Sequence, residues 1–192
     1  MANQPLSYAP IHIVEGEQGS GKTNTMVARV VDAYKKDRTL KIYCNFHLYG
    51  IPYAYLPLHI MIQYLNSGLI RDAYLLIDEG YIGGNAREGM SSLVRVITKM
   101  ANQIRKRRLH FYIATPNARQ LDWQFRWAKT ETILCSYDDK TRMITVMIKN
   151  KRKYRRPRII TYYAPQYWKY YDTDEQFKIP EGQIAKALEN VW

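Results

Sequence analysis

The most constraining feature of this sequence is a glycine-rich segment at residues 16–23, which reads Gly-Glu-Gln-Gly-Ser-Gly-Lys-Thr. It matches every fixed position of the G-x-x-x-x-G-K-[ST] phosphate-binding loop. An apolar run at residues 11–14 precedes it, and apolar residues recur at helical spacing over residues 24–36. Because a strand, a glycine loop and a helix in this order bind phosphate, the sequence predicts a nucleoside-triphosphate site.

The residue types of the loop indicate how it would bind ATP and Mg²⁺. Glycines let successive backbone N–H groups point toward one anion at the start of a helix. Lys22 would reach the β- and γ-phosphates, and the Thr23 hydroxyl would be a ligand of Mg²⁺. The pattern leaves ATP and GTP equally open. The predicted nucleotide-binding residues are Gly16, Glu17, Gln18, Gly19, Ser20, Gly21, Lys22, Thr23 and Asn24.

An acidic pair, Asp78 and Glu79, directly follows an apolar run at residues 73–77. Such a run is typical of a strand that is buried on both faces. Asp78 at the end of this strand would share the Mg²⁺ with Thr23. Glu79 would orient and deprotonate an attacking water. The pair therefore favours hydrolysis of the bound nucleotide.

Two more catalytic candidates lie downstream. The apolar run at residues 109–114 ends in Thr-Pro-Asn, and Asn117 is the candidate sensor of the γ-phosphate. Arg126 is the candidate for an arginine that stabilises charge on the transferred phosphoryl group, commonly from a neighbouring subunit. Arg87 and Arg119 are alternatives for this role.

Strand and helix patterns alternate along the first two-thirds of the chain, which favours an α/β fold with a mostly parallel sheet. The expected helices span residues 24–36, 58–66 and 90–107, and the expected strands span residues 11–15, 41–45, 73–77 and 109–114. The last third instead predicts an antiparallel meander and a terminal helix. Its expected strands are residues 132–137, 141–148 and 158–163, and its helix is residues 180–191.

The positive charge of the chain is concentrated in one region. The chain carries 29 Lys and Arg against 17 Asp and Glu, a net charge of +12. Residues 99–158 alone hold 17 basic and 4 acidic residues, a net charge of +13, so the remainder sums to −1. A localised basic region is typical of a protein that binds a polyanion.

Seven of the ten residues from 149 to 158 are basic and would lie between two strands, in an exposed loop that grips DNA phosphates. A kinase lid that closes over phosphates is the alternative. A second cluster at residues 105–108 suits either DNA or the carboxyl end of a helix. Aromatic residues crowd positions 162–177, where no site is assigned. The predicted DNA-binding residues are Lys149, Lys151, Arg152, Lys153, Arg155, Arg156 and Arg158.

Length and composition suggest one domain over residues 1–192, with a core at 10–137 and a β-rich basic extension with a terminal helix at 138–192.

No apolar stretch is long enough to span a bilayer, and no secretory signal is visible. Cys44 and Cys135 lack metal or redox spacing, which predicts two buried reduced thiols. We expect a host-intracellular or virion location.

The order of these motifs resembles the FtsK-HerA superfamily of DNA-pumping ATPases over residues 10–137: phosphate loop, Asp78-Glu79, long helix, Ala114-Thr115, then Asp122 and Arg126. Within it, the compact size resembles genome-packaging ATPases of membrane-containing icosahedral viruses, such as tectiviruses and turreted archaeal viruses. The resemblance implies a RecA-like core, ATP and Mg²⁺ as cofactors, a homo-oligomeric ring and translocation of double-stranded DNA. Capsid or membrane-vertex proteins are possible further partners.

Pro116-Asn117 departs from that superfamily, which usually has glutamine after Ala-Thr. The Ala-Thr-Pro-Asn segment also resembles the zonula-occludens-toxin-like proteins of filamentous phages, which are tied to phage assembly. Those proteins usually have a degraded phosphate loop and a membrane-spanning helix, whereas this loop is intact. Viral genome packaging is therefore the leading expectation. The alternatives are a phage-extrusion or other DNA-processing ATPase, a nucleoside or polynucleotide kinase, and a non-catalytic assembly protein gated by nucleotide.

Overall fold

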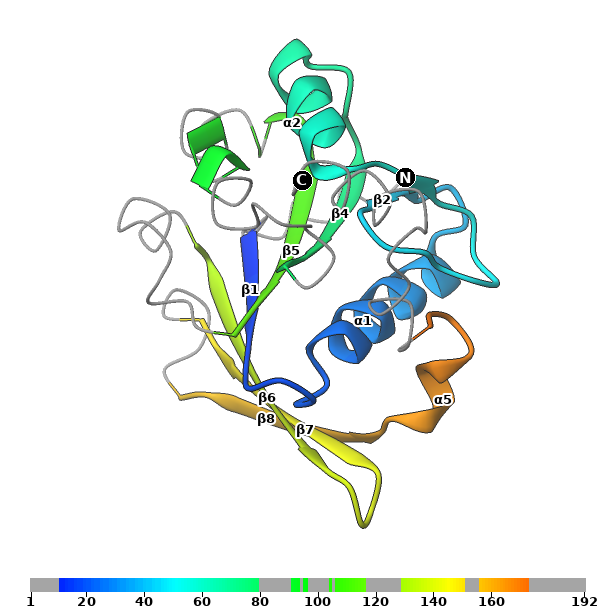
Figure 1. Ribbon diagram of the computed structural model, residues 1–192, viewed down its shortest axis with the longest axis vertical. Helices are drawn as coiled ribbons and strands as arrows, with labels where there is room; N and C mark the ends of the chain where they lie inside the picture. Colours follow the sequence, from blue (N-terminus) through cyan, green and yellow to red (C-terminus); the bar gives the residue numbers. More distant parts are fainter. Residues whose placement is uncertain are drawn as a thin grey trace, which may run out of the picture.

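The computed structural model describes residues 11–79, 91–93, 95–96, 104, 106–116, 129–150 and 156–172. The described strands are β1 (Ile11–Glu15), β2 (Lys41–Cys44), β3 (Ala54–Tyr55), β4 (Ala73–Asp78), β5 (Leu109–Thr115), β6 (Glu131–Asp138), β7 (Met143–Lys149) and β8 (Arg158–Tyr163). The helices with described bounds are α1 (Lys22–Lys36), α2 (Leu58–Ser67) and α5 (Pro165–Trp168). Figure 1 shows these elements arranged around one twisted sheet.

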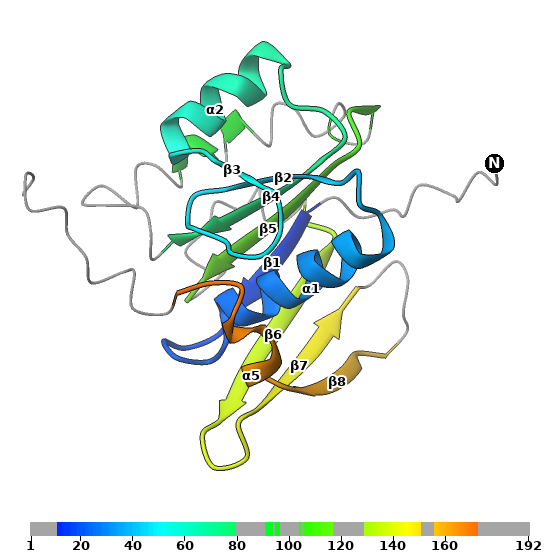
Figure 2. The ribbon, with the colours of Figure 1, turned by 90° about the vertical axis from the view of Figure 1, so that its right-hand side faces the viewer.

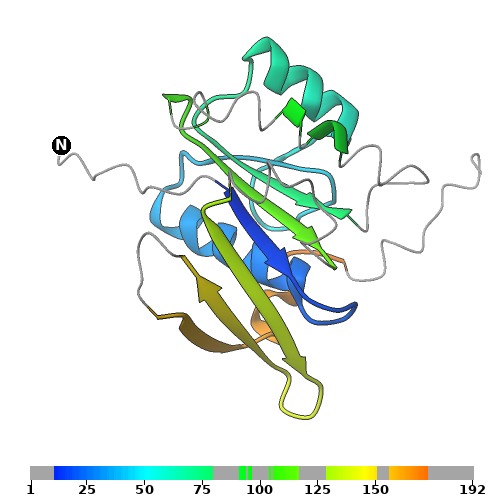
Figure 3. The same ribbon diagram turned by 90° about the vertical axis from the view of Figure 1, so that its left-hand side faces the viewer.

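The sheet has eight strands in the order β3-β2-β4-β5-β1-β6-β7-β8. From β3 to β6 all neighbouring strands pair in parallel, and β7 and β8 then pair antiparallel. This confirms the predicted α/β fold with a mostly parallel sheet and antiparallel C-terminal strands. The sequence interpretation grouped β6 with the antiparallel meander, but β6 also pairs in parallel with β1, so the change of direction occurs between β6 and β7. Figure 3 shows the strands from the side away from α1.

Helices cover both faces of the sheet because buried strand residues alternate between two cores. Ile11 and Ile13 of β1 point to the face covered by α2, where Leu93, Val96 and Ile104 also pack. Val14 points to the other face, against α1. Figure 2 shows α1 lying across this face with α5 beside it. The described residues between 91 and 106 are helical, in agreement with the helix predicted there.

Local chemistry explains where the two longer helices end. At the end of α1, the Asp37 N–H donates to Ala33 O, and Lys35 and Lys36 in the last turn suit the negative end of the helix dipole. Helix α2 follows Pro57 and ends before Gly68, whose φ of 77° is the left-handed conformation that glycine adopts readily. Both helices match the sequence prediction within two residues.

Two elements escaped the sequence analysis. One is β3, whose two residues add a parallel edge strand beside β2. The other is α5, which follows β8 and begins with Pro165 at its first turn. Several of the C-terminal aromatic side chains fill the core between the sheet and α1. These aromatic residues are Tyr162, Tyr167, Tyr170 and Tyr171. Cys44 and Cys135 are buried free thiols, as predicted.

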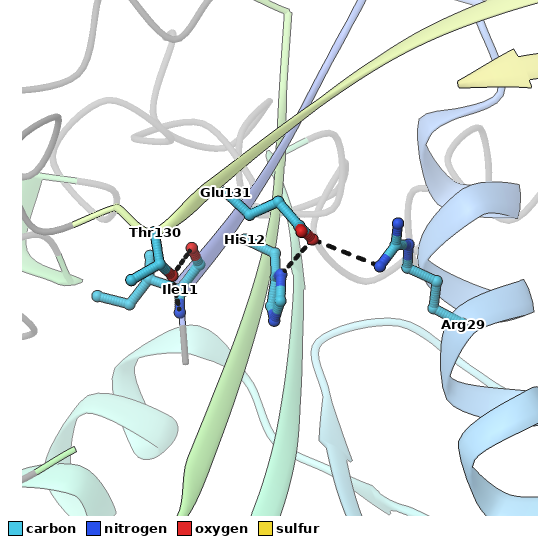
Figure 4. Close-up of polar contacts among 5 residues, drawn as sticks. All are labelled: Ile11, His12, Arg29, Thr130 and Glu131. Atoms are coloured by element: carbon cyan, nitrogen blue, oxygen red, sulfur yellow. Dashed lines mark hydrogen bonds and ion pairs between the residues drawn. The ribbon is translucent and has the colours of Figure 1, made fainter. Parts of the chain in front are cut away.

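A buried polar cluster ties β1 to β6 at the amino ends of these strands (Figure 4). His12 Nδ1 lies 2.8 Å from Glu131 Oε2, and Arg29 Nη1 donates to the same oxygen at 3.4 Å. Burial would raise the pKa of Glu131, but the hydrogen bond and charge of His12 and the charge of Arg29 outweigh it and lower that pKa. Beside it, the Thr130 hydroxyl donates to Ile11 O at 2.8 Å. The cluster therefore orients β1, which delivers the loop at its other end.

Candidate nucleotide-binding site

The glycine-rich loop at residues 16–23 joins β1 to α1, as the motif predicts. Gly19 and Gly21 have φ angles of 75° and 87°, in the left-handed region that side chains disfavour. Gly16 is constrained by space instead. A Cβ atom there would lie 2.4 Å from Ser20 Oγ and 2.8 Å from the backbone oxygen of Cys135. The glycines are therefore needed for the path of the backbone.

Lys22 lies at the start of α1 and folds back over the loop. Its Nζ donates to Gly16 O at 3.0 Å and to Glu17 O at 2.8 Å. These bonds hold the ammonium group where it can meet phosphate oxygens bound by the loop. The structure thus places the predicted lysine at the predicted anion site.

Thr23 and Asp78 lie together although 55 positions separate them in the sequence. The Thr23 hydroxyl donates to Asp78 Oδ2 at 2.5 Å, and Asp78 is only 4% exposed at the carboxyl end of β4. A hydroxyl and a carboxylate are the oxygen ligands that Mg²⁺ takes, and Mg²⁺ usually completes its shell with substrate phosphates and water. No group of three His, Cys, Asp or Glu side chains suited to a metal occurs among the described residues.

Asn45 completes this part of the site and was missed by the sequence analysis. Its side-chain amide donates to Asp78 O at 2.9 Å, and its Oδ1 accepts from the Asp78 N–H at 2.9 Å. Asn45 follows β2 directly, so the amide extends the pairing of β2 and β4 beyond the last residue of β2. The signal in the sequence was a polar residue at the end of an apolar strand, in the same position as Asp78.

The loop and the acidic pair open onto one cavity of about 1010 Å³. This volume is at the upper end for small-molecule sites and is large enough for a whole nucleotide. Glu79 lines it, and Glu79 Oε2 is buried without a hydrogen-bond partner in the described part of the chain. The cavity is lined by Gln18, Gly19, Gly21, Lys22, Thr23, Asn24, Tyr49, Asp78, Glu79, Ala114, Pro116, Tyr137, Ile144, Ala164, Trp168, Lys169, Tyr171 and Asp172.

Part of the cavity lining comes from the segment of residues 164–172, which we call the C-terminal strap. Asn24, the residue after Thr23, binds it through its side-chain amide, which donates to Ala164 O at 3.2 Å and to the Tyr171 hydroxyl at 3.1 Å. Burial raises the pKa of Tyr171, and the nearby charge of Asp78 raises it further. The hydrogen bond from Asn24 lowers this pKa but does not outweigh the other two effects. The phenol therefore remains a neutral hydroxyl near Asn24 and Asp78.

Several predicted site residues cannot be placed. Asn117 and Arg126, and the alternatives Arg87 and Arg119, lie outside the described residues. The same holds for four of the predicted DNA-binding residues, namely Lys151, Arg152, Lys153 and Arg155. The described members of that group are exposed at the ends of β7 and β8. They are Lys149, Arg156 and Arg158.

Two of the solved structures that share this architecture are similar to most of the chain. The N-terminal domain of zonular occludens toxin from Neisseria meningitidis matches with a TM-score of 0.61 at 18% identity, covering 85% of this chain and 99% of that one. A KaiC-like protein from the hyperthermophilic archaeon Pyrococcus horikoshii matches with a TM-score of 0.52 at 13% identity, covering 80% and 90%. The chain has a RecA-like P-loop NTPase fold. No protein-family model and no curated protein matches the sequence.

No helix among the described residues is long and apolar enough to cross a membrane.

The P-loop NTPase fold places its nucleotide at the carboxyl ends of the parallel strands, where this chain has Asp78 and the cavity. The geometry around Lys22, Thr23 and Asp78 therefore agrees with the fold that the comparisons reveal.

Proposed function

We propose that this chain binds ATP with Mg²⁺ and hydrolyses it. The observation that carries the proposal is the meeting of Lys22, the Thr23–Asp78 pair and Glu79 at a single cavity. A chance glycine-rich turn would not bring a buried carboxylate from β4 within 2.5 Å of the hydroxyl that follows its lysine. Each group also matches a separate requirement of phosphoryl transfer to water.

In the proposed mechanism the loop N–H groups and Lys22 hold the triphosphate in place. Mg²⁺ held by Thr23 and Asp78 would neutralise charge on the phosphate oxygens. Glu79 Oε2, which has no other partner among the described groups, accepts a proton from the attacking water and orients it toward the γ-phosphorus. Asn45 holds the backbone of Asp78 and so positions this carboxylate.

Replacement of Glu79 by Gln tests this assignment. We expect Glu79→Gln to bind ATP but to lose about 100-fold or more in hydrolysis, because glutamine cannot accept the proton. Asp139→Asn in the β6–β7 turn removes an exposed carboxylate that does not line the cavity and serves as the matched control. Turnover by Glu79→Gln at the rate of the unchanged protein would show that Glu79 does not activate water.

We further propose that hydrolysis moves DNA during phage or virus assembly. The net charge of +13 over residues 99–158 supports a polyanion partner, and the exposed Lys149, Arg156 and Arg158 support contact with its phosphates. Double-stranded DNA, contacted through its backbone without base readout, is the proposed substrate. A homo-oligomeric ring is the proposed assembly, because an arginine such as Arg126 would then act in the neighbouring site.

Two settings fit such a motor. Phage assembly and extrusion is favoured by the likeness to the N-terminal domain of zonular occludens toxin, which extends over 99% of that domain. Genome packaging, with capsid or membrane-vertex proteins as partners, is the second setting and is favoured by the intact phosphate loop. Stimulation of phosphate release by duplex DNA, rising with protein concentration, is the expected behaviour of a ring motor in either setting.

A kinase is the remaining alternative, and the fate of the γ-phosphate separates it from a motor. With labelled ATP we expect the label to appear as inorganic phosphate. Label on a nucleoside or on a DNA 5′-hydroxyl would instead identify a kinase and contradict the proposal.

A further inference from the structure

We propose that the nucleobase of the bound nucleotide stacks on the Trp168 indole, in the part of the cavity bounded by Tyr137 and Ile144. This inference rests on the proposed nucleotide binding and adds to it the recognition of the base. The three residues line the same cavity as the phosphate loop, but they come from β6, β7 and α5. None of the sequence motifs points to them.

The strand order determines the direction in which a nucleotide lies. Asp78 ends β4, two strands from β1 on one side, whereas Tyr137 and Ile144 lie on β6 and β7 on the other side. In a phosphate loop the lysine reaches the β- and γ-phosphates and the backbone N–H groups hold the α- and β-phosphates. With the γ-phosphate at Asp78 and Glu79, the nucleoside leaves the loop toward β6 and β7.

The floor of this part of the cavity is an apolar pair close to the loop. Tyr137 and Ile144 are directly opposite each other in the β6–β7 ladder. A Cβ atom on Gly21 would lie 2.5 Å from Ile144 Cδ1, so this side chain packs against the last glycine of the loop. A base that emerges beside Gly21 therefore meets an apolar surface.

Trp168 supplies an aromatic face at this place, and neighbouring residues of the strap anchor the segment that carries it. It is 40% exposed, and the Arg142 guanidinium lies 6.0 Å from its ring centre. The strap that carries it is anchored by Asn24 at Ala164 and Tyr171. Next to it, the Tyr167 hydroxyl donates to Asp32 Oδ2 at 3.0 Å. An indole on an anchored segment is available to stack on a base without movement of the backbone that carries it.

Stacking accepts any base because every base has a π-face, and a purine offers more area than a pyrimidine. The ligand class is therefore a nucleoside triphosphate, with purines favoured over pyrimidines, whose triphosphate is bound by the loop and whose base is bound by Trp168. The contributions of the triphosphate and of the base to the binding affinity can therefore be measured separately.

The test compares MgATP with inorganic triphosphate, which has the phosphates but no base, by titration calorimetry. We expect Trp168→Ala to weaken MgATP binding about 10-fold and to leave the affinity for triphosphate unchanged. Trp168→Phe keeps an aromatic face and should retain most of the ATP affinity. Tyr163→Ala, which removes an exposed aromatic side chain outside the cavity lining, is the matched control.

Equal ATP affinity in Trp168→Ala and the unchanged protein would overturn the proposal. So would an equal loss for both probes, because Trp168 would then act on the phosphates or on the fold, which thermal unfolding of the variant would reveal. Lys22→Ala tests the proposed function separately, since it should weaken both probes. If Lys22→Ala binds both probes normally, phosphate binding by the loop is wrong whatever Trp168 does.

Discussion

Asn45 and Asp78 form a closed pair of hydrogen bonds in which a side-chain amide takes the place of a strand backbone. The amide both donates to and accepts from the backbone of Asp78, at 2.9 Å in each case. Because Asn45 is only 3% exposed, water cannot replace these bonds. The pair fixes the end of β4 at the residue whose carboxylate contacts Thr23.

We expect Asn45→Ala to lower the free energy of unfolding by about 1–3 kcal/mol, because it removes two buried hydrogen bonds to the backbone of Asp78. The Mg²⁺ concentration needed for half-maximal ATP hydrolysis should rise as well. Urea unfolding and a Mg²⁺ titration of the ATPase rate measure the two effects. Asn66→Ala, on the exposed side of α2, is the control. A variant as stable as the unchanged protein would contradict the role of the amide.

Alanine substitutions at Gly19 and Gly21 separate the effect of the backbone φ angle on stability from the effect of packing around the loop. Both have left-handed φ angles, but only Gly21 faces a side chain, that of Ile144. Alanine in a left-handed conformation costs about 1–2 kcal/mol, so we expect this loss of stability from Gly19→Ala. Gly21→Ala should cost at least about 1 kcal/mol more, because overpacking is added.

Thermal or urea unfolding of the two alanine variants measures the difference. Adding Ile144→Val to Gly21→Ala removes the Cδ1 atom that a new Cβ would meet, and it should restore part of the lost stability. If the second substitution lowers stability further, the contact with Ile144 is not what makes Gly21 necessary.

The lowered pKa of His110 predicts how the stability of the fold depends on pH. Burial and the neighbouring His12 lower the pKa of His110 to about 4. Between this value and the ordinary pKa near 6.5, the unfolded chain binds a proton that the folded chain does not. The free energy of unfolding should therefore fall as the pH is lowered through this range, by up to about 3 kcal/mol from this group.

His110→Phe keeps a ring where His110 stacks on Tyr74, with ring centres 4.6 Å apart, but cannot titrate. We expect a flatter pH dependence of the urea midpoint between about pH 6.5 and pH 4.5 in this variant. His59→Phe, at an exposed position of α2, should leave the dependence unchanged. An unchanged slope in His110→Phe would mean that other groups cause the acid sensitivity.

The exposed basic residues at the ends of β7 and β8 should contribute to DNA affinity through counterion release. Replacing Lys149, Arg156 and Arg158 together by Ala should reduce the slope of log affinity against log salt by about 3 on duplex DNA. Fluorescence anisotropy over a salt series measures the slope. Replacing Lys36, Lys41 and Arg71, which are exposed on other parts of the chain, removes the same charge. Equal effects from the two sets would argue against a localised DNA contact.

Features that depend on residues close together in the sequence were predicted well. The loop, the helix after it and the strand that ends in Asp78 each have a local pattern, and the structure brings Lys22, Thr23 and Asp78 together as the motif requires. The role of Asn45 depends instead on which strand lies beside β2. The bond from Asn24 to Ala164 joins positions 140 residues apart, so only the assembled sheet reveals it.

Strand β7 touches the loop at one end and the basic region at the other. Ile144 packs against Gly21, and Lys149 is the last residue of the same strand, about 17 Å away at the usual rise per residue. Both sides of β7 are hydrogen-bonded, to β6 and to β8, so the strand cannot bend easily along this distance. A displacement at Gly21 would therefore be transmitted along β7 to Lys149, because the strand moves as one rigid segment.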